Sequence, residues 1–161
     1  KNIIMAAQQC EGLTEKQIIV IPTATVPQGI TAMMSFSPDE PDPQTIAQAM
    51  IAAAQTVSTA QITYAARNSD FDGFAINEGD YLALLDGKLF GTSRSMDELL
   101  EKLSDHAAEA GAEYINIYTG EGVSEDEGAQ TEALFAQRCP DAEVAVIPGG
   151  QSVYFYIISI E

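Results

Sequence analysis

The sequence predicts an α/β fold, in which a mostly parallel sheet is flanked by helices and carries an antiparallel hairpin insertion around residues 60–93. Short apolar segments alternate with segments of helical period, which is the order expected for parallel strands joined by helices. Two of the apolar segments, residues 18–21 and 144–147, are followed or ended by proline, which lacks the N–H that a strand ladder needs. The pair Asp86-Gly87 between two apolar runs is a strong sign of a hairpin turn.

The first third of the chain is expected to form helices around one strand. Ile18, Ile19, Val20 and Ile21 are consecutively apolar, which is typical of a strand buried on both faces. Asp42 is a favourable N-cap, because its carboxylate can accept from the backbone of a helix that begins at the next residue. Apolar residues recur at helical spacing before and after the strand. The expected helices span residues 2–13, 27–36 and 43–57.

The remainder begins with the antiparallel region and then returns to alternation. Ser95 and Ser124 each precede a glutamate by three residues, which is the capping-box pattern of a helix start. Gly111 is a typical helix end. The expected helices are residues 96–110 and a second one that follows Ser124 and runs to about Arg138. The expected strands are 61–66, 74–76, 81–85, 88–92, 114–118, 144–147 and 154–160.

Composition limits the classes of function. The chain has 161 residues, with 24 Asp and Glu against 7 Lys and Arg, for a formal net charge of -17. Such a surface repels nucleic acids and anionic membranes, and it favours a basic partner. A generic acidic cytosolic surface explains the same charge. No apolar run reaches transmembrane length, and we expect a cytoplasmic protein.

Two cysteines, Cys10 and Cys139, lie far apart and form no Cys-x-x-Cys pair, so a reducing compartment is the simpler assumption. Cys10 lies near Ala7 at helical spacing and is expected to be a small core residue. The sequence begins inside an expected helix without an initiator Met. We therefore expect residues 1–161 to form a single α/β domain and to be a fragment of a longer protein.

The sequence offers no self-sufficient catalytic or metal-binding motif. His106 is the one histidine, and nothing near it in sequence completes a zinc ligand set. A Walker loop and a Gly-x-Ser-x-Gly nucleophile elbow are both absent from the sequence. We expect neither catalytic residues nor a metal site in this chain.

Polar loop residues at the ends of the predicted strands are the remaining candidates for binding. If strands 18–21 and 144–147 are parallel neighbours, the loops after them lie at the same edge of the sheet, where ligands and partners are usually met. Arg67 suits a carboxylate or an anion, although a salt bridge to Asp70, Asp72 or another acidic residue is an open alternative. For the other loops, the alternative is that they are ordinary connections after strands, without a binding role. We call this set the predicted rim: Thr23, Thr25, Gln28, Arg67, Asn68, Gly149, Gly150 and Gln151.

Several blocks in this order resemble the C-terminal domain of the catalytic subunit of fatty acid kinase, whose family is dihydroxyacetone kinase-like and is also labelled DAK phosphatase. The resemblance runs from the first residue to the last. At two places the chain departs from the family pattern, with Ala24 in place of a lysine and Asn68-Ser69 in place of Asp-Thr. The blocks that carry the resemblance are Lys1 to Gln9, Ile21-Pro22-Thr23-Ala24-Thr25-Val26-Pro27-Gln28-Gly29, Thr63-Tyr64-Ala65-Ala66-Arg67 with Asp72-Gly73, Glu78-Gly79-Asp80, and Gly149-Gly150-Gln151 with Tyr156 to Glu161.

The resemblance implies a bacterial ATP-dependent kinase that phosphorylates a fatty acid held by a separate DegV-type fatty-acid-binding protein. It implies that this part has DegV-like architecture. It also implies that ATP and magnesium bind in an N-terminal domain outside this chain, so that the chain itself holds no cofactor. Neither cysteine, nor His106, matches the family's catalytic positions, which lie upstream.

The preferred hypothesis is a non-catalytic domain that helps the rest of its own polypeptide to dock the DegV-type protein. One alternative is an independent DegV-like module, in which the predicted rim holds a fatty acid carboxylate or a phosphorylated small molecule. Another is self-association as a homodimer, through the terminal strand Tyr154–Ile160 or the alanine-rich helix.

Overall fold

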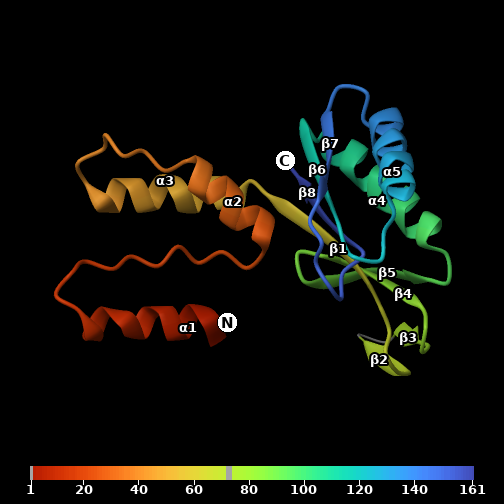
Figure 1. Cartoon of the computed structure of the whole chain (residues 1–161), viewed down its shortest axis with the longest axis horizontal. Coiled ribbons are helices and arrows are strands. Elements are labelled where there is room, and N and C mark those ends of the chain that lie inside the picture. The colour runs from red at the N-terminus through yellow and green to blue at the C-terminus, as the bar shows by residue number, and fades with distance from the viewer. Residues whose placement is uncertain (1, 72–73) are drawn as a thin grey trace. The chain divides into compact units, whose positions relative to one another are not determined.

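Residues 2–71 and 74–161 are described by the computed structural model, which is drawn in Figure 1. The chain divides into two units, Lys1–Val57 and Ser58–Glu161, which we call the helical unit and the sheet unit. The turn expected at Asp72-Gly73 lies outside the described residues.

The helical unit contains α1 (Asn2–Gln8), a 3-10 helix η1 (Gln9–Leu13), α2 (Val26–Met34) and α3 (Pro43–Gln55). The predicted start of α3 is confirmed, because the Asp42 carboxylate accepts from the backbone N–H groups of Gln44 and Thr45. The Thr45 hydroxyl also donates to this carboxylate. This bond first, and the backbone bonds after it, hold the pKa of Asp42 below its ordinary value. Buried residues of α2 and α3 pack with two partly buried isoleucines, in a small core of Ala32, Met50, Ala54, Ile21 and Ile46.

Two expectations for this unit are wrong, namely the buried strand at residues 18–21 and the core position of Cys10. Residues 18–21 belong to no strand within the described part of the chain, and their side chains are only partly buried. No residue of α1 is buried in the described structure, and Ile3 is 85% exposed. Cys10 is likewise exposed rather than in a core. Apolar period alone does not bury a helix, because burial needs a second surface to pack against.

The described part of the sheet unit contains a six-stranded sheet in the order β5-β4-β1-β8-β6-β7 and a separate two-stranded pair, β2 and β3. The sheet strands are β1 (Ser58–Tyr64), β4 (Tyr81–Leu85), β5 (Lys88–Ser93), β6 (Tyr114–Thr119), β7 (Glu143–Pro148) and β8 (Tyr156–Ile160), and the small pair is β2 (Ser69–Phe71) and β3 (Phe74–Ile76).

The sheet is mostly antiparallel, which corrects the expected parallel sheet. Among the strands described, only β6 and β7 pair in parallel. The reason is that β8 inserts between β1 and β6 and runs opposite to both. The hairpin is also not an insertion, since β4 pairs with β1 and so extends the main sheet. The mixed α/β class itself is confirmed.

The interior position of β8 also bears on self-association. Both of its edges are hydrogen-bonded within the sheet unit, to β1 and to β6. All five of its residues, Tyr156–Ile160, are buried. A strand with no free edge cannot pair with a second copy, so the homodimer through this strand is excluded.

Helices α4 (Met96–Ala110) and α5 (Glu125–Arg138) cover one face of the sheet (Figure 1). Between them and the strands lies the main core, to which alternate residues of the strands contribute. Its largest fully buried members are Phe135, Ile62, Leu99, Leu103, Ile115, Ile117 and Ile158.

The two predicted capping boxes differ in the structure. Ser124 and Glu127 form both reciprocal bonds of the motif at the start of α5, and the hydroxyl of Ser124 lowers the pKa of Glu127. At α4, Ser95 accepts from the backbone of Glu98, but the Glu98 carboxylate binds Lys102 and Ser93 instead of returning the bond. A lysine one turn along the helix therefore competes for the carboxylate.

The hairpin turn depends on Asp86, and this gives a test of the fold. Asp86 and Gly87 have φ of 50° and 77°, as a type I′ turn requires. The Asp86 carboxylate accepts from the buried backbone N–H of Thr59 and from the Ser58 hydroxyl, both at 2.8 Å. Asp86→Ala should lower the free energy of unfolding by about 1–3 kcal/mol, because it removes the acceptor for a buried donor.

Chemical denaturation of Asp86→Ala, Asp86→Asn and the parent chain checks this. Asp86→Asn keeps an acceptor oxygen and tolerates positive φ, so it should lose less than about 1 kcal/mol. Equal loss in the two variants would contradict the assigned role of the carboxylate.

Candidate functional site: the loops at one end of the sheet

The strand directions bring several loops to one end of the sheet unit. β1 and β6 both run antiparallel to β8, and β7 runs parallel to β6. The carboxyl ends of β1, β6 and β7 therefore lie at the same end of the sheet. The loops that follow them contain Arg67 and Asn68, the residues after Thr119, and Gly149 to Gln151.

The loop from Gly149 to Phe155 is held by its own hydrogen bonds. The backbone N–H groups of Gly149 and Gly150 both donate to the Thr119 carbonyl at 2.9 Å. The Gln151 side-chain amide donates to the Tyr118 carbonyl at 2.9 Å. These donors of the predicted rim are therefore occupied within the fold, and their role in the structure is to close the end of the sheet.

Gly120 allows this loop to approach the sheet. Its N–H donates to the Phe155 carbonyl at 2.8 Å. A Cβ at this position would lie 2.1 Å from the Tyr154 carbonyl oxygen. Only glycine fits at such a distance, because any side chain would collide with that backbone oxygen.

Val153 is a strained residue at the tip of the same loop. It has a φ of 74°, which is an outlier for a β-branched residue. Its carbonyl accepts from the Thr63 hydroxyl at 2.7 Å, and the N–H of Tyr154 donates to Ser152 across it at 2.8 Å. The strain is therefore maintained by neighbouring bonds, a pattern that clusters at functional sites. The Val153 side chain is 66% exposed.

Tyr64 lies beside this strained loop. It is 52% exposed, and its ring lies 6.3 Å from that of Phe155 between centroids, tilted by 58°. Phe155 in turn meets Tyr81 edge-on at 5.6 Å. The Tyr64 ring thus packs against Phe155 and is partly exposed to solvent.

Arg67 follows Tyr64 by three residues, so its Cα lies within about 11 Å of that of Tyr64. Its side chain is exposed and has no carboxylate partner among the side chains that the structure describes. The alternative partners, Asp70 and Asp72, are outside that set. We call Tyr64, Arg67 and Val153 the sheet-end surface.

The backbone around Arg67 is fixed by the turn before β4. The side-chain oxygen of Asn68 accepts from the N–H of Glu78 at 2.6 Å. The N–H of Ala65 donates to the Asp80 carbonyl at 2.8 Å. The side-chain oxygen of Asn68 therefore helps to hold this loop in place.

The buried Asp80 carboxylate organises the same turn. It accepts from the backbone N–H and the side-chain amide of Asn77, each at 3.0 Å, and Arg94 lies 3.5 Å away. These bonds, led by the one from the Asn77 backbone, hold the pKa of Asp80 below its ordinary value. Asp80 is 6% exposed in the structure and is ionised there at neutral pH.

The other residues of the predicted rim belong to the helical unit, and they act at the start of α2. The Thr25 side chain accepts from the Gln28 N–H at 3.4 Å as an N-cap. The Gln28 side-chain oxygen accepts from the Ala24 N–H at 2.9 Å, and the Thr23 N–H donates to Ile21 at 2.8 Å. The prediction of a shared sheet edge required residues 18–21 and 144–147 to be neighbouring parallel strands, and residues 18–21 form no strand in the described structure. A common rim of all eight residues stays a prediction.

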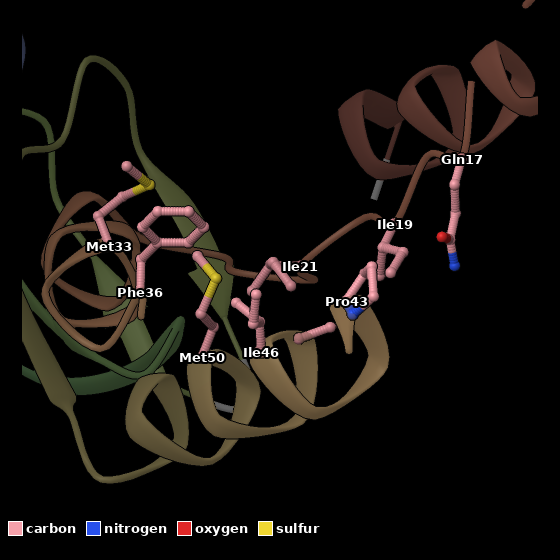
Figure 2. Close-up of a pocket in the computed structure, with 9 residues that line it drawn as sticks. Gln17, Ile19, Ile21, Met33, Phe36, Pro43, Ile46 and Met50 are labelled. Atoms are coloured by element: carbon pink, nitrogen blue, oxygen red, sulfur yellow. The ribbon is translucent and has the colours of Figure 1, made fainter. Parts of the chain in front are cut away.

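The helical unit also contains an apolar cavity of ≈ 430 Å³. Figure 2 shows Met33 and Phe36 on one side of it and side chains of α3 on another. No residue of the predicted rim is among those that line this cavity. The lining residues are Gln17, Ile19, Ile21, Met33, Phe36, Pro43, Ile46, Ala47 and Met50.

The residues that the structure describes contain no group of three or more His, Cys, Asp or Glu side chains that could hold a metal ion. None of the helices described is both long and apolar enough to cross a lipid bilayer.

Comparison with known sequences identifies a family. The model of the fatty acid kinase FakA-like C-terminal family matches residues 1–161. Protein YloV of Bacillus subtilis is 36% identical over 160 residues, which are 99% of this chain and 29% of YloV. An uncharacterised protein of Staphylococcus aureus strain USA300 is 30% identical over 162 residues, which cover 100% of this chain and 29% of that protein. The chain thus spans under a third of the length of these relatives.

Solved structures share the fold at low sequence identity. A DegV family protein from Ruminococcus gnavus, solved with vaccenic acid, has a TM-score of 0.62 and 13% identity, covering 98% of this chain and 65% of its own. The fatty acid binding DegV family protein of Streptococcus agalactiae gives 0.58 and 17%, covering 99% and 64%. The Streptococcus pneumoniae fatty acid kinase B3 protein loaded with linoleic acid gives 0.52 and 13%, covering 73% and 49%.

The lowered pKa of Asp80 predicts how stability depends on pH. A carboxylate whose pKa is lower in the folded state contributes stability above its unfolded pKa, and loses it as pH falls through the folded value. Asp80→Asn should therefore lower stability at neutral pH and reduce its decline in the acid range. Denaturation midpoints measured from neutral to acid pH check this. The exposed Asp141→Asn is the control, and an unchanged acid decline in Asp80→Asn would refute the assignment.

Proposed function

The chain belongs to the FakA-like C-terminal family of fatty acid kinase proteins, and we propose that it docks the DegV-type fatty-acid-binding protein whose acyl group the complete kinase phosphorylates. The observation that carries this proposal is the family match over residues 1–161. In this proposal the chain contributes no catalytic residue. ATP and magnesium bind in another domain of a cytoplasmic protein, outside these residues, and the domain's task is to position the carrier.

The sheet-end surface is the part of the sheet unit best suited to docking. It combines an exposed tyrosine, an exposed valine on a strained and hydrogen-bonded loop, and an arginine. Tyrosine and arginine are enriched among residues that dominate binding energy at interfaces. A pre-organised loop loses little conformational freedom on binding, which favours affinity.

The charge of the chain adds selectivity to this surface. With 24 acidic against 7 basic residues, most of the molecule repels another acidic protein. Several basic residues are engaged by carboxylates, since Lys102 binds Glu98, Arg138 binds Asp105 and Arg94 lies beside Asp80. Arg67 has no such partner among the described side chains, so it is well placed to meet a carboxylate of the carrier.

A binding titration tests the proposal. The cognate DegV-type protein should bind the 161-residue chain, and Arg67→Ala should weaken the Kd by at least about fivefold, because it removes the cation of the sheet-end surface. Lys88→Ala is the matched control. Lys88 is an exposed cation next to the hairpin turn, at the opposite end of β1 from Arg67, and its removal should leave the Kd unchanged.

Three outcomes contradict the proposal or its surface. If the folded chain does not bind the carrier, the docking role is wrong. If Lys88→Ala weakens binding as much as Arg67→Ala, the docking face lies elsewhere or is merely electrostatic. If the protein as purified carries a fatty acid, detected by native mass spectrometry, an independent fatty-acid-binding module is the better account.

A further inference from the structure

Residues 18–21 have the sequence of a strand but no strand partner in the described structure. Ile18, Ile19, Val20 and Ile21 are all β-branched and apolar, a composition that favours a pleated and buried strand. Yet the segment between η1 and α2 runs as a coil (Figure 1). Among the described residues, its only backbone–backbone hydrogen bond at these positions is the one from Thr23 to the Ile21 carbonyl.

The packing of this segment is also one-sided. Ile21 reaches the small core of α2 and α3, and Ile19 and Ile21 line one wall of the apolar cavity (Figure 2). The opposite wall carries Met33 and Phe36, which are 66% and 50% exposed. Apolar side chains lining an open space of ≈ 430 Å³ lack the neighbours that a packed layer would supply.

The matched structures are larger than this chain. The two DegV-family structures match this chain almost throughout, yet the match covers only 64% and 65% of their own lengths. About a third of that fold therefore has no counterpart in these 161 residues. The curated relatives are longer still, since the chain covers 29% of their length.

We infer that Ile18–Ile21 is a β-strand that forms by pairing with a strand of the same polypeptide outside these 161 residues. The pairing is parallel, because a run of consecutive apolar residues leading into a helix is the pattern of a parallel βα unit. The apolar cavity is the space that side chains next to the added strand fill. This inference is independent of the docking proposal.

Amide hydrogen exchange tests the inference directly. Peptides covering residues 14–24 are compared in the 161-residue chain, at several concentrations, and in the complete gene product. The segment should exchange at rates near those of an unfolded peptide in the 161-residue chain. In the complete protein its exchange should slow by at least about a hundredfold, because paired strand amides open only through larger unfolding events.

A different partner for residues 18–21, or a ligand in the cavity, would give a different result, and each such result overturns the inference. Equal, fast exchange in both proteins means that no strand forms. Slow exchange in the 161-residue chain at every concentration means that the partner lies within it. Protection that rises with concentration, together with a dimer by light scattering, assigns the pairing to a second copy. Protection gained on adding oleic acid to the 161-residue chain assigns the cavity to a lipid.

Proline variants separate strand pairing from packing. Ile19→Pro and Val20→Pro remove N–H groups that point to opposite sides of an extended chain, and Ile19→Ala and Val20→Ala are controls that keep them. In the complete protein, at least one proline variant should unfold about 4 °C or more below its alanine control. In the 161-residue chain, each proline variant should match its control. If each proline variant also unfolded at the same temperature as its alanine control in the complete protein, strand pairing would be contradicted.

Discussion

The insertion of β8 between β1 and β6 is the constraint on which the sheet unit depends. β8 is hydrogen-bonded along both edges, and each of its five residues is buried. β1, β4 and β5 meet β6 and β7 only through this strand, among the strands described. The last strand must therefore be in place before the two parts of the sheet form one core, which favours cooperative and comparatively slow folding.

The same strand determines what the sheet unit presents to other molecules. Because β8 runs opposite to β1 and β6, the carboxyl ends of β1, β6 and β7 lie together. The loop entering β8 must cross these ends, and it is bound there by the Thr119 carbonyl, the Thr63 hydroxyl and the approach allowed by Gly120. These bonds sustain the positive φ of Val153 and leave its side chain exposed. The sheet-end surface is thus a consequence of the topology.

Local patterns in the sequence predicted local structure well. The Asp86-Gly87 turn, the Asp42 and Ser124 caps and the helices after them depend on neighbouring residues, and all are confirmed. Strand direction could not be predicted in this way, because the place of β8 is decided by pairing between residues far apart in the sequence. Residues 18–21 show the same limit, since β-propensity makes a strand only when a partner is present. Of the candidate site, Arg67 was identified as an unusual cation, whereas no local pattern marks a positive φ at Val153 or the exposure of Tyr64.

We propose that the sheet-end surface is the part of this chain that meets the fatty-acid carrier. Mapping backbone amide NMR shifts of the 161-residue chain on addition of the cognate DegV-type protein tests it most directly. The account predicts changes concentrated at residues 64–68 and 149–155, with residues 86–88 at the opposite end of β1 unaffected. Shift changes centred on the hairpin turn would contradict this proposal. So would the absence of shift changes in the 161-residue chain when the complete protein binds the carrier saturably.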